Sequence, residues 1–232
     1  PVDINQEKKN LPHTVLEAMP ISKLLLLGFK ETPEQSDSEQ SEEEFRNEGE
    51  KKLDTISSQL EKAQIDFDLK LIFSNKIATQ IKQFIEEENL QFILTLKPLS
   101  DLNQLIIPIY DLSQINTKLS TIIYNLHSNK PTKIKVLIFT KDKDGSSDEA
   151  HLRNAMTNQL ALLNINVDDF EVYLKEKESP QKLVQKISKK NDLIIWSEVE
   201  PSQREFLFNI ILEKEKTEIS SPSILILKSE GN

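Results

Sequence analysis

The sequence predicts an α/β protein of two tandem domains, each a parallel β-sheet flanked by helices in a Rossmann-like three-layer sandwich. Short apolar runs, of the length of buried strands, alternate with segments whose apolar residues recur every three or four positions, as on one helix face. The segments with this periodicity are long enough to form helices that cross over between parallel strands. The strand and helix order of residues 1–102 recurs in residues 103–232, which predicts an internal duplication.

The first half begins with a short strand and continues through alternating helices and strands. Its strands are predicted at residues 1–4, 24–27, 66–73 and 91–94. Its helices are predicted around residues 14–19, from residue 41 onward and over residues 77–85. Residues 32–44 are rich in Ser, Glu, Gln, Asp and Pro and are predicted to form a solvated loop. Ser41 and Glu44 match a capping box, so a helix is predicted to start there. The alternating pattern at 66–73 is typical of a strand near a sheet edge.

The second half repeats this order and adds one helix and one strand. Its strands are predicted at residues 105–111, 136–139, 169–174, 192–196 and 224–227. Its helices are predicted over residues 119–126, from Ser146, from Ser179 and from about Ser202. Ser146 with Glu149 forms a second capping box, and Ser179 with Pro180 is a typical helix start. Between Pro98 and Leu105 the first half has no room for the added elements, so the first domain is predicted to be incomplete.

The composition excludes several function classes. With 38 acidic and 29 basic residues the net charge is -9, which argues against nucleic-acid binding and against binding to anionic membranes. The absence of cysteine excludes disulfides and thiolate chemistry and fits a reducing, cytoplasmic location. The apolar run at residues 24–27 is too short to span a bilayer, and no signal peptide is recognised. The sequence begins inside a predicted strand without methionine, which suggests a trimmed N-terminus or the end of a longer polypeptide.

The loop after residues 192–196 is the most informative part of the sequence. In a doubly wound sheet, loops at the carboxyl ends of strands line the ligand cleft. The chain has four glycines, and none lies between Trp196 and Ser223, whereas loops that cradle phosphates need several glycines close together. Glu198 and Glu200 would also place negative charge near a bound phosphate. These features argue against nucleotide binding.

Several short segments together resemble tandem universal stress proteins, particularly the archaeal type. The segments are residues 11–15 (Leu-Pro-His-Thr-Val), 25–29 (Leu-Leu-Leu-Gly-Phe), 32–35 (Thr-Pro-Glu-Gln), 71–74 (Leu-Ile-Phe-Ser), 105–108 (Leu-Ile-Ile-Pro) and 197–202 (Ser-Glu-Val-Glu-Pro-Ser). The resemblance implies a five-stranded parallel sheet in each domain, domain pairing about a pseudo-two-fold axis, and a role in stress response. Similar modules also occur as cytoplasmic tails of amino-acid, cation-proton and cation-chloride transporters.

The resemblance also indicates where a ligand would be expected. Nucleotide-binding members of the family carry a Gly-x2-Gly-x9-Gly-Ser/Thr loop after the fourth strand and an aspartate at the end of the first strand. Asp3 and Asp111 match the aspartate position, but the glycine loop is absent. The two aspartates are either ligand contacts or turn and helix-capping residues. Trp196 replaces the first loop glycine, where it either fills the nucleotide space or packs as an ordinary strand-end aromatic residue.

The remaining cleft candidates are Lys141, which a solvated loop also explains, and Ser197, which follows Trp196. The three histidines, His13, His127 and His151, lack the spacing of metal ligands. No nucleophile elbow, P-loop or dinucleotide fingerprint is present, so the sequence predicts neither an enzyme nor a bound cofactor or metal.

These observations favour a non-catalytic universal-stress-protein-like module that acts in stress response or regulation through protein contacts. One alternative is a cytoplasmic regulatory domain tethered to a membrane transporter, without membrane insertion of its own. A second alternative is a nucleotide-binding signalling switch. Because the edge strands of a sheet need covering, the halves are expected to pack on each other or on a second chain, which favours a homodimer.

Overall fold

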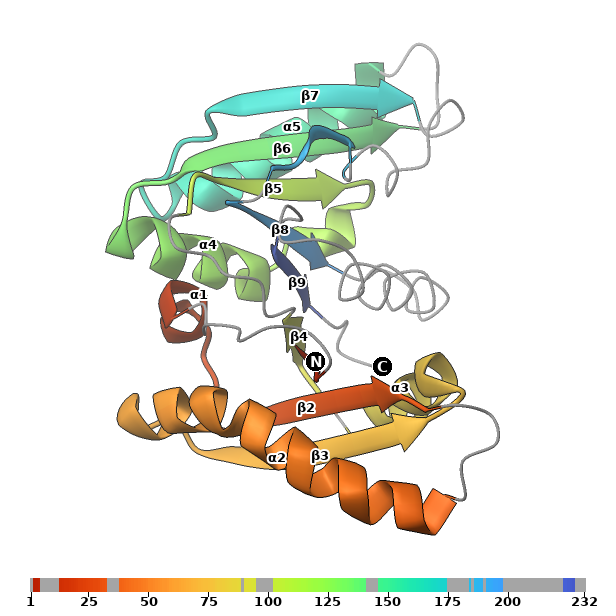
Figure 1. Cartoon of the computed structure of the whole chain (residues 1–232). Helices are drawn as coiled ribbons and strands as arrows, with labels where there is room; N and C mark the ends of the chain where they lie inside the picture. The colour runs from red at the N-terminus through yellow and green to blue at the C-terminus, as the bar shows by residue number, and fades with distance from the viewer. Residues whose placement is uncertain are drawn as a thin grey trace.

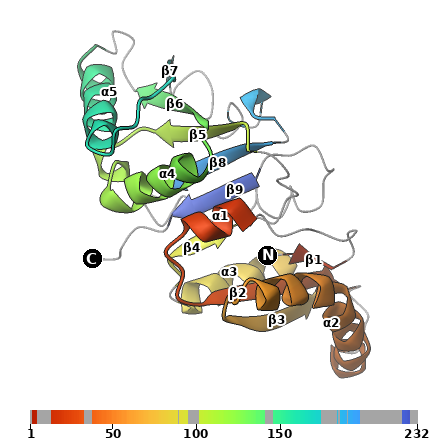
Figure 2. The same cartoon turned by 90° about the vertical axis from the view of Figure 1, so that its left-hand side faces the viewer.

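The computed structural model shows two β-sheets with helices packed around them (Figure 1). It describes residues 2–4, 13–32, 38–88, 90–94, 102–140, 146–174, 184, 186–189, 191–197 and 223–227. In the view of Figure 2, α1 lies between β9 of the larger sheet and the strands β2 and β3 of the smaller sheet. The structure is therefore a mixed α/β protein in which parallel strands predominate, as the sequence predicts.

The smaller sheet has three parallel strands in the order β1-β2-β3. These strands are β1 (Val2–Asp3), β2 (Leu24–Glu31) and β3 (Phe67–Ser74). The helices of this part of the chain are α1 (His13–Ala18), α2 (Ser38–Lys62) and α3 (Ile77–Glu87). The alternating segment forms β3 at the sheet edge, as expected from a strand with one solvated face.

The larger sheet has six strands in the order β4-β9-β8-β5-β6-β7. They are β4 (Phe92–Leu94), β5 (Gln104–Ile109), β6 (Lys133–Thr140), β7 (Asp169–Leu174), β8 (Asp192–Ser197) and β9 (Ser223–Leu227). The helical elements of this half are η1 (Leu112–Gln114), α4 (Thr117–Asn129) and α5 (Ser146–Ala161). Strands β5 to β9 are parallel, whereas β4 runs antiparallel to β9.

The order of the larger sheet defines a doubly wound topology. From β5 the chain proceeds through β6 to β7 on one side, then returns to place β8 and β9 on the other side of β5. The first three strands of each half have the same order, but the fourth strands differ. β8 pairs with β5, while β4 leaves the smaller sheet and pairs with β9. The division into domains 1–102 and 103–232 therefore stays a prediction.

Two details of the smaller sheet's half differ from the expectations. Helix α2 begins at Ser38, so residues 38–44 are helical and Ser41 lies inside the helix instead of capping it. The residues there include glutamate and glutamine, which have good helix propensity, and acidic residues near a helix start also favour the helix dipole. The resemblance implies five strands in each sheet, and the sequence predicts four strands in the first half and five in the second; the described strands instead form sheets of three and six, because β4 adds to β9.

Some predicted elements fall wholly or partly outside the described residues. Ser179 and Pro180, the predicted helix start, lie outside them, while Val184, Lys186 and Ile187 are helical. The helix expected from about Ser202 also lies outside them.

The core consists of two hydrophobic clusters. The α4-side cluster includes Met19, Leu105, Ile107, Leu119, Ile122, Leu193, Ile195, Leu225 and Leu227. The α3-side cluster includes Phe29, Ile81, Ile106, Leu137, Ile194, Trp196 and Ile226. Successive residues of β8 alternate between the clusters, as side chains on opposite faces of a strand must. Each cluster draws residues from both halves of the sequence.

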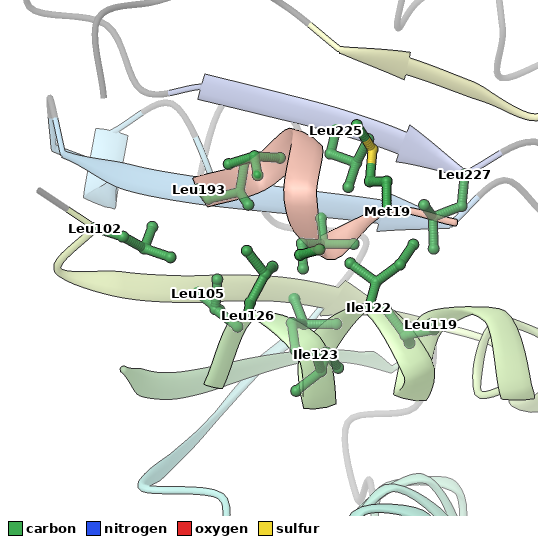
Figure 3. Close-up of a cluster of buried hydrophobic side chains, with 14 of the residues drawn as sticks. Met19, Leu102, Leu105, Leu119, Ile122, Ile123, Leu126, Leu193, Leu225 and Leu227 are labelled. Atoms are coloured by element: carbon green, nitrogen blue, oxygen red, sulfur yellow. The ribbon is translucent and has the colours of Figure 1, made fainter. Parts of the chain in front are cut away.

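Helix α1 links the halves within the α4-side cluster. Figure 3 shows Met19, just after α1, among side chains of α4 and β9. The side-chain amide of Asn125 in α4 donates a hydrogen bond of 2.8 Å to the carbonyl oxygen of Ala18 at the end of α1. Among the described residues, no helix combines the length and apolar character needed to cross a membrane.

Candidate functional site

The carboxyl ends of β5 and β8 form the switch point of the larger sheet, because the chain leaves these two strands in opposite directions. The two strands pair in register over Gln104–Ile106 and Asp192–Ile194. Beyond Ile106 and Ile194 no further pairing joins them in the described structure. A crevice between strand ends at such a point is where doubly wound proteins bind ligands. The residues that end these two strands therefore form the candidate site.

Gln114 spans the switch point. Its Oε1 accepts hydrogen bonds from the backbone N–H groups of Tyr110, at 2.7 Å, and Asp111, at 3.1 Å. Its Nε2 donates to the carbonyl oxygen of Ser197 at 2.7 Å. The side chain is buried, with only 1% of Gln114 exposed. One amide thus satisfies two donors after β5 and one acceptor at the end of β8.

Local sequence positions Gln114. Asp111 is the N-cap of η1, and its Oδ1 accepts hydrogen bonds from the backbone N–H of Ser113, at 2.8 Å, and from its hydroxyl, at 2.7 Å. Gln114 completes this capping box by accepting from the Asp111 N–H. Asn116 then caps α4 by accepting from the N–H of Leu119 at 2.9 Å. The turn after β5 is thus fixed by side-chain caps, and Asp111 has the geometry of a capping residue.

Trp196 and Ser197 are both buried at the end of β8. The Trp196 side chain belongs to the α3-side cluster, and its indole Nε1 has no hydrogen-bond acceptor among the described residues. The carbonyl oxygen of Ser197 is engaged by Gln114. The Trp196 side chain therefore packs among apolar residues near the switch point, on the face of the sheet opposite the α4-side cluster.

The remaining candidates do not join this group. Asp3 ends β1 in the smaller sheet, where it pairs in register with Phe29 of β2. Asp3 is the last residue of β1 in the smaller sheet, whereas Asp111 lies two residues beyond the end of β5 in the larger sheet. Lys141, Glu198 and Glu200 lie outside the described residues.

Sequence reasoning missed Gln114, although a local signal was present. Residues 111–114 read Asp-Leu-Ser-Gln, which has the spacing of a capping box directly after a buried strand. That pattern predicts a short helical turn, but it cannot predict the contact with Ser197, which is 83 positions away in the sequence.

The histidines are dispersed. In the part of the chain that the structure describes, no group of three or more histidine or acidic side chains is arranged to hold a metal ion. His13 and His151 are exposed on different helices. His127, near the end of α4, has its Nδ1 3.1 Å from the carbonyl oxygen of Thr132, so its ring takes part in the turn leading to β6.

The fold and the switch point define a doubly wound, parallel-dominated α/β protein. No family model matches the chain, and no curated protein matches its sequence. The resemblance to universal stress proteins therefore stays a prediction from short motifs. Because one α/β scaffold hosts many functions, function has to be argued from the switch point itself.

Proposed function

We propose that the protein is a non-catalytic regulatory module that acts through protein contacts and does not hold a nucleotide at the switch point. The observation that carries this proposal is the buried amide of Gln114, which joins the ends of β5 and β8 where a ligand would enter. The stress-response setting and the cytoplasmic location rest on the sequence alone.

The free-energy cost of breaking the Gln114 hydrogen bonds disfavours the entry of a ligand at the switch point. A ligand that entered between β5 and β8 would have to replace the three hydrogen bonds of Gln114. Each buried group left without a partner costs about 1–3 kcal/mol. A nucleotide would therefore need strong compensating contacts, and phosphates usually obtain them from a glycine-rich loop. The sequence has no glycine between Trp196 and Ser223 to form one.

Charge supports the same proposal. The chain carries a net charge of -9, and the sequence places Glu198 and Glu200 directly after β8. Negative charge near the crevice disfavours a polyphosphate, most strongly where water is excluded. Protein contacts carry no such penalty, because an interface can match acidic groups with basic ones.

Nucleotide titration tests the proposal. Trp196 is the only tryptophan, so protein fluorescence excited at the indole reports on the switch point alone. We expect no change in fluorescence, and no bound mass in native mass spectrometry, with ATP-Mg or adenosine at about millimolar concentration. Saturable binding of ATP-Mg would contradict the proposal and restore the signalling-switch alternative. Binding of adenosine alone would identify a base pocket that lacks a phosphate site.

Self-association is the first protein contact to examine. β3 is an outer strand of the smaller sheet, and β7 is the outer strand of the larger sheet at the end opposite β4. Neither strand has a second neighbour among the described strands. β7 carries Asp169 and Glu171, charges that discourage strand addition at an edge. β3 likewise carries Asp68 and Lys70. Each edge exposes one apolar side chain, Leu69 on β3 and Val172 on β7, so neither edge is favoured over the other. A strictly monomeric mass at high micromolar concentration would remove the homodimer from this proposal.

A further inference from the structure

We draw no further inference here: the strongest candidate, the apolar cavity that β2 and β4 line, carries none, because the pairing of Val2 with Gly28 places the strand partners of residues 24–27 at Pro1 and ahead of it, and nothing in the structure shows what covers that edge.

Discussion

At the scale of single residues, the buried amide of Gln114 joins the ends of β5 and β8. Its Oε1 accepts and its Nε2 donates, so at neutral pH a side-chain amide satisfies both strand ends where a carboxylate cannot. Gln114→Glu keeps the acceptor for Tyr110 and Asp111 but places a carboxylate oxygen against the Ser197 carbonyl. We expect a loss of about 2–4 kcal/mol in the free energy of unfolding at neutral pH.

The pH dependence of the unfolding free energy of Gln114→Glu separates the effect of the carboxylate charge from other effects of the substitution. As pH falls from neutral toward the unfolded-state pKa of about 4.3, the buried carboxyl is protonated and can donate to the Ser197 carbonyl, so the difference from wild type should shrink and then level off. Urea midpoints between pH 3.5 and pH 7.5, covering roughly the range in which glutamate titrates, measure this difference. Gln80→Glu is the control, because Gln80 is exposed on α3. A loss independent of pH, or equal in both variants, would contradict the role assigned to the Gln114 amide.

Glu171, on the outer strand β7 of the larger sheet, has a shifted pKa. Hydrogen bonding from Lys135 of β6, and then from Tyr173 of β7, lowers the pKa of Glu171 below its usual value. A lowered folded-state pKa means that this stabilisation is present above the unfolded pKa of about 4.3 and is lost as pH falls through the folded value. Because Glu171 is 35% exposed, solvent screening limits the contribution to about 1 kcal/mol or less.

Glu171→Gln is therefore expected to lower stability at pH 7 slightly and to flatten its decline in acid. Thermal unfolding followed from pH 7 down to about pH 3 measures both effects. Glu61→Gln, on the exposed surface of α2, controls for the change in net charge. If Glu171→Gln and Glu61→Gln have the same pH profile, the Lys135–Glu171 pair does not contribute as described.

At the scale of elements, the packing of α2 on β2 depends on a close approach at Gly28. A Cβ atom there would lie 2.6 Å from Leu53 Cδ1 of α2 and 2.7 Å from Leu71 Cδ2 of β3. Gly28→Ala is therefore expected to cost about 1–3 kcal/mol in unfolding free energy, because both side chains must move. Gly49→Ala meets its neighbours at 3.3 Å and gains roughly 1 kcal/mol of helix propensity, so it should be close to neutral.

Chemical denaturation of the two variants checks this contrast, since each adds the same methyl group. The mechanism predicts that the double variant Gly28→Ala, Leu53→Ala loses less unfolding free energy than the sum of the two single losses, because shortening Leu53 removes the atom nearest to the added methyl group. Independent, additive effects of Gly28→Ala and Leu53→Ala would show that the two residues do not compete for space.

The sequence predicts the existence of most described elements but not their full length or pairing. The apolar run at 24–27 marks β2, yet β2 continues to Glu31 because its ladder with β3 extends beyond the apolar residues. A three-residue strand such as β4 carries no local information on its direction. Its antiparallel partner β9 is set by a contact across more than 130 positions between Phe92 and Leu227. The bridge from Gln114 to Ser197 was unpredictable for the same reason.

At the scale of the whole molecule, elements from the first half of the sequence pack into the sheet and core of the second half. β4, from the first half of the sequence, forms the outer strand of the six-stranded sheet, and α1 packs on α4 of the second half. Leu119, Ile122 and Met19 lie in one buried cluster, so this part of the core is built from both halves of the sequence. We therefore expect one cooperative unfolding transition for the full chain.

Fragments test this expectation at the boundary that the sequence predicts. A fragment of residues 103–232 lacks β4 and α1, so it would expose the edge of β9 and the buried face of α4. Exposed strand edges and apolar faces drive association. We expect this fragment to self-associate in size-exclusion chromatography and to unfold at least about 10 °C below the full chain. Adding residues 90–102 restores β4 and should recover part of the stability but not the cover that α1 gives α4. A monomeric 103–232 fragment as stable as the full chain would instead establish an independent second domain, and β4 and α1 would then be attachments to it.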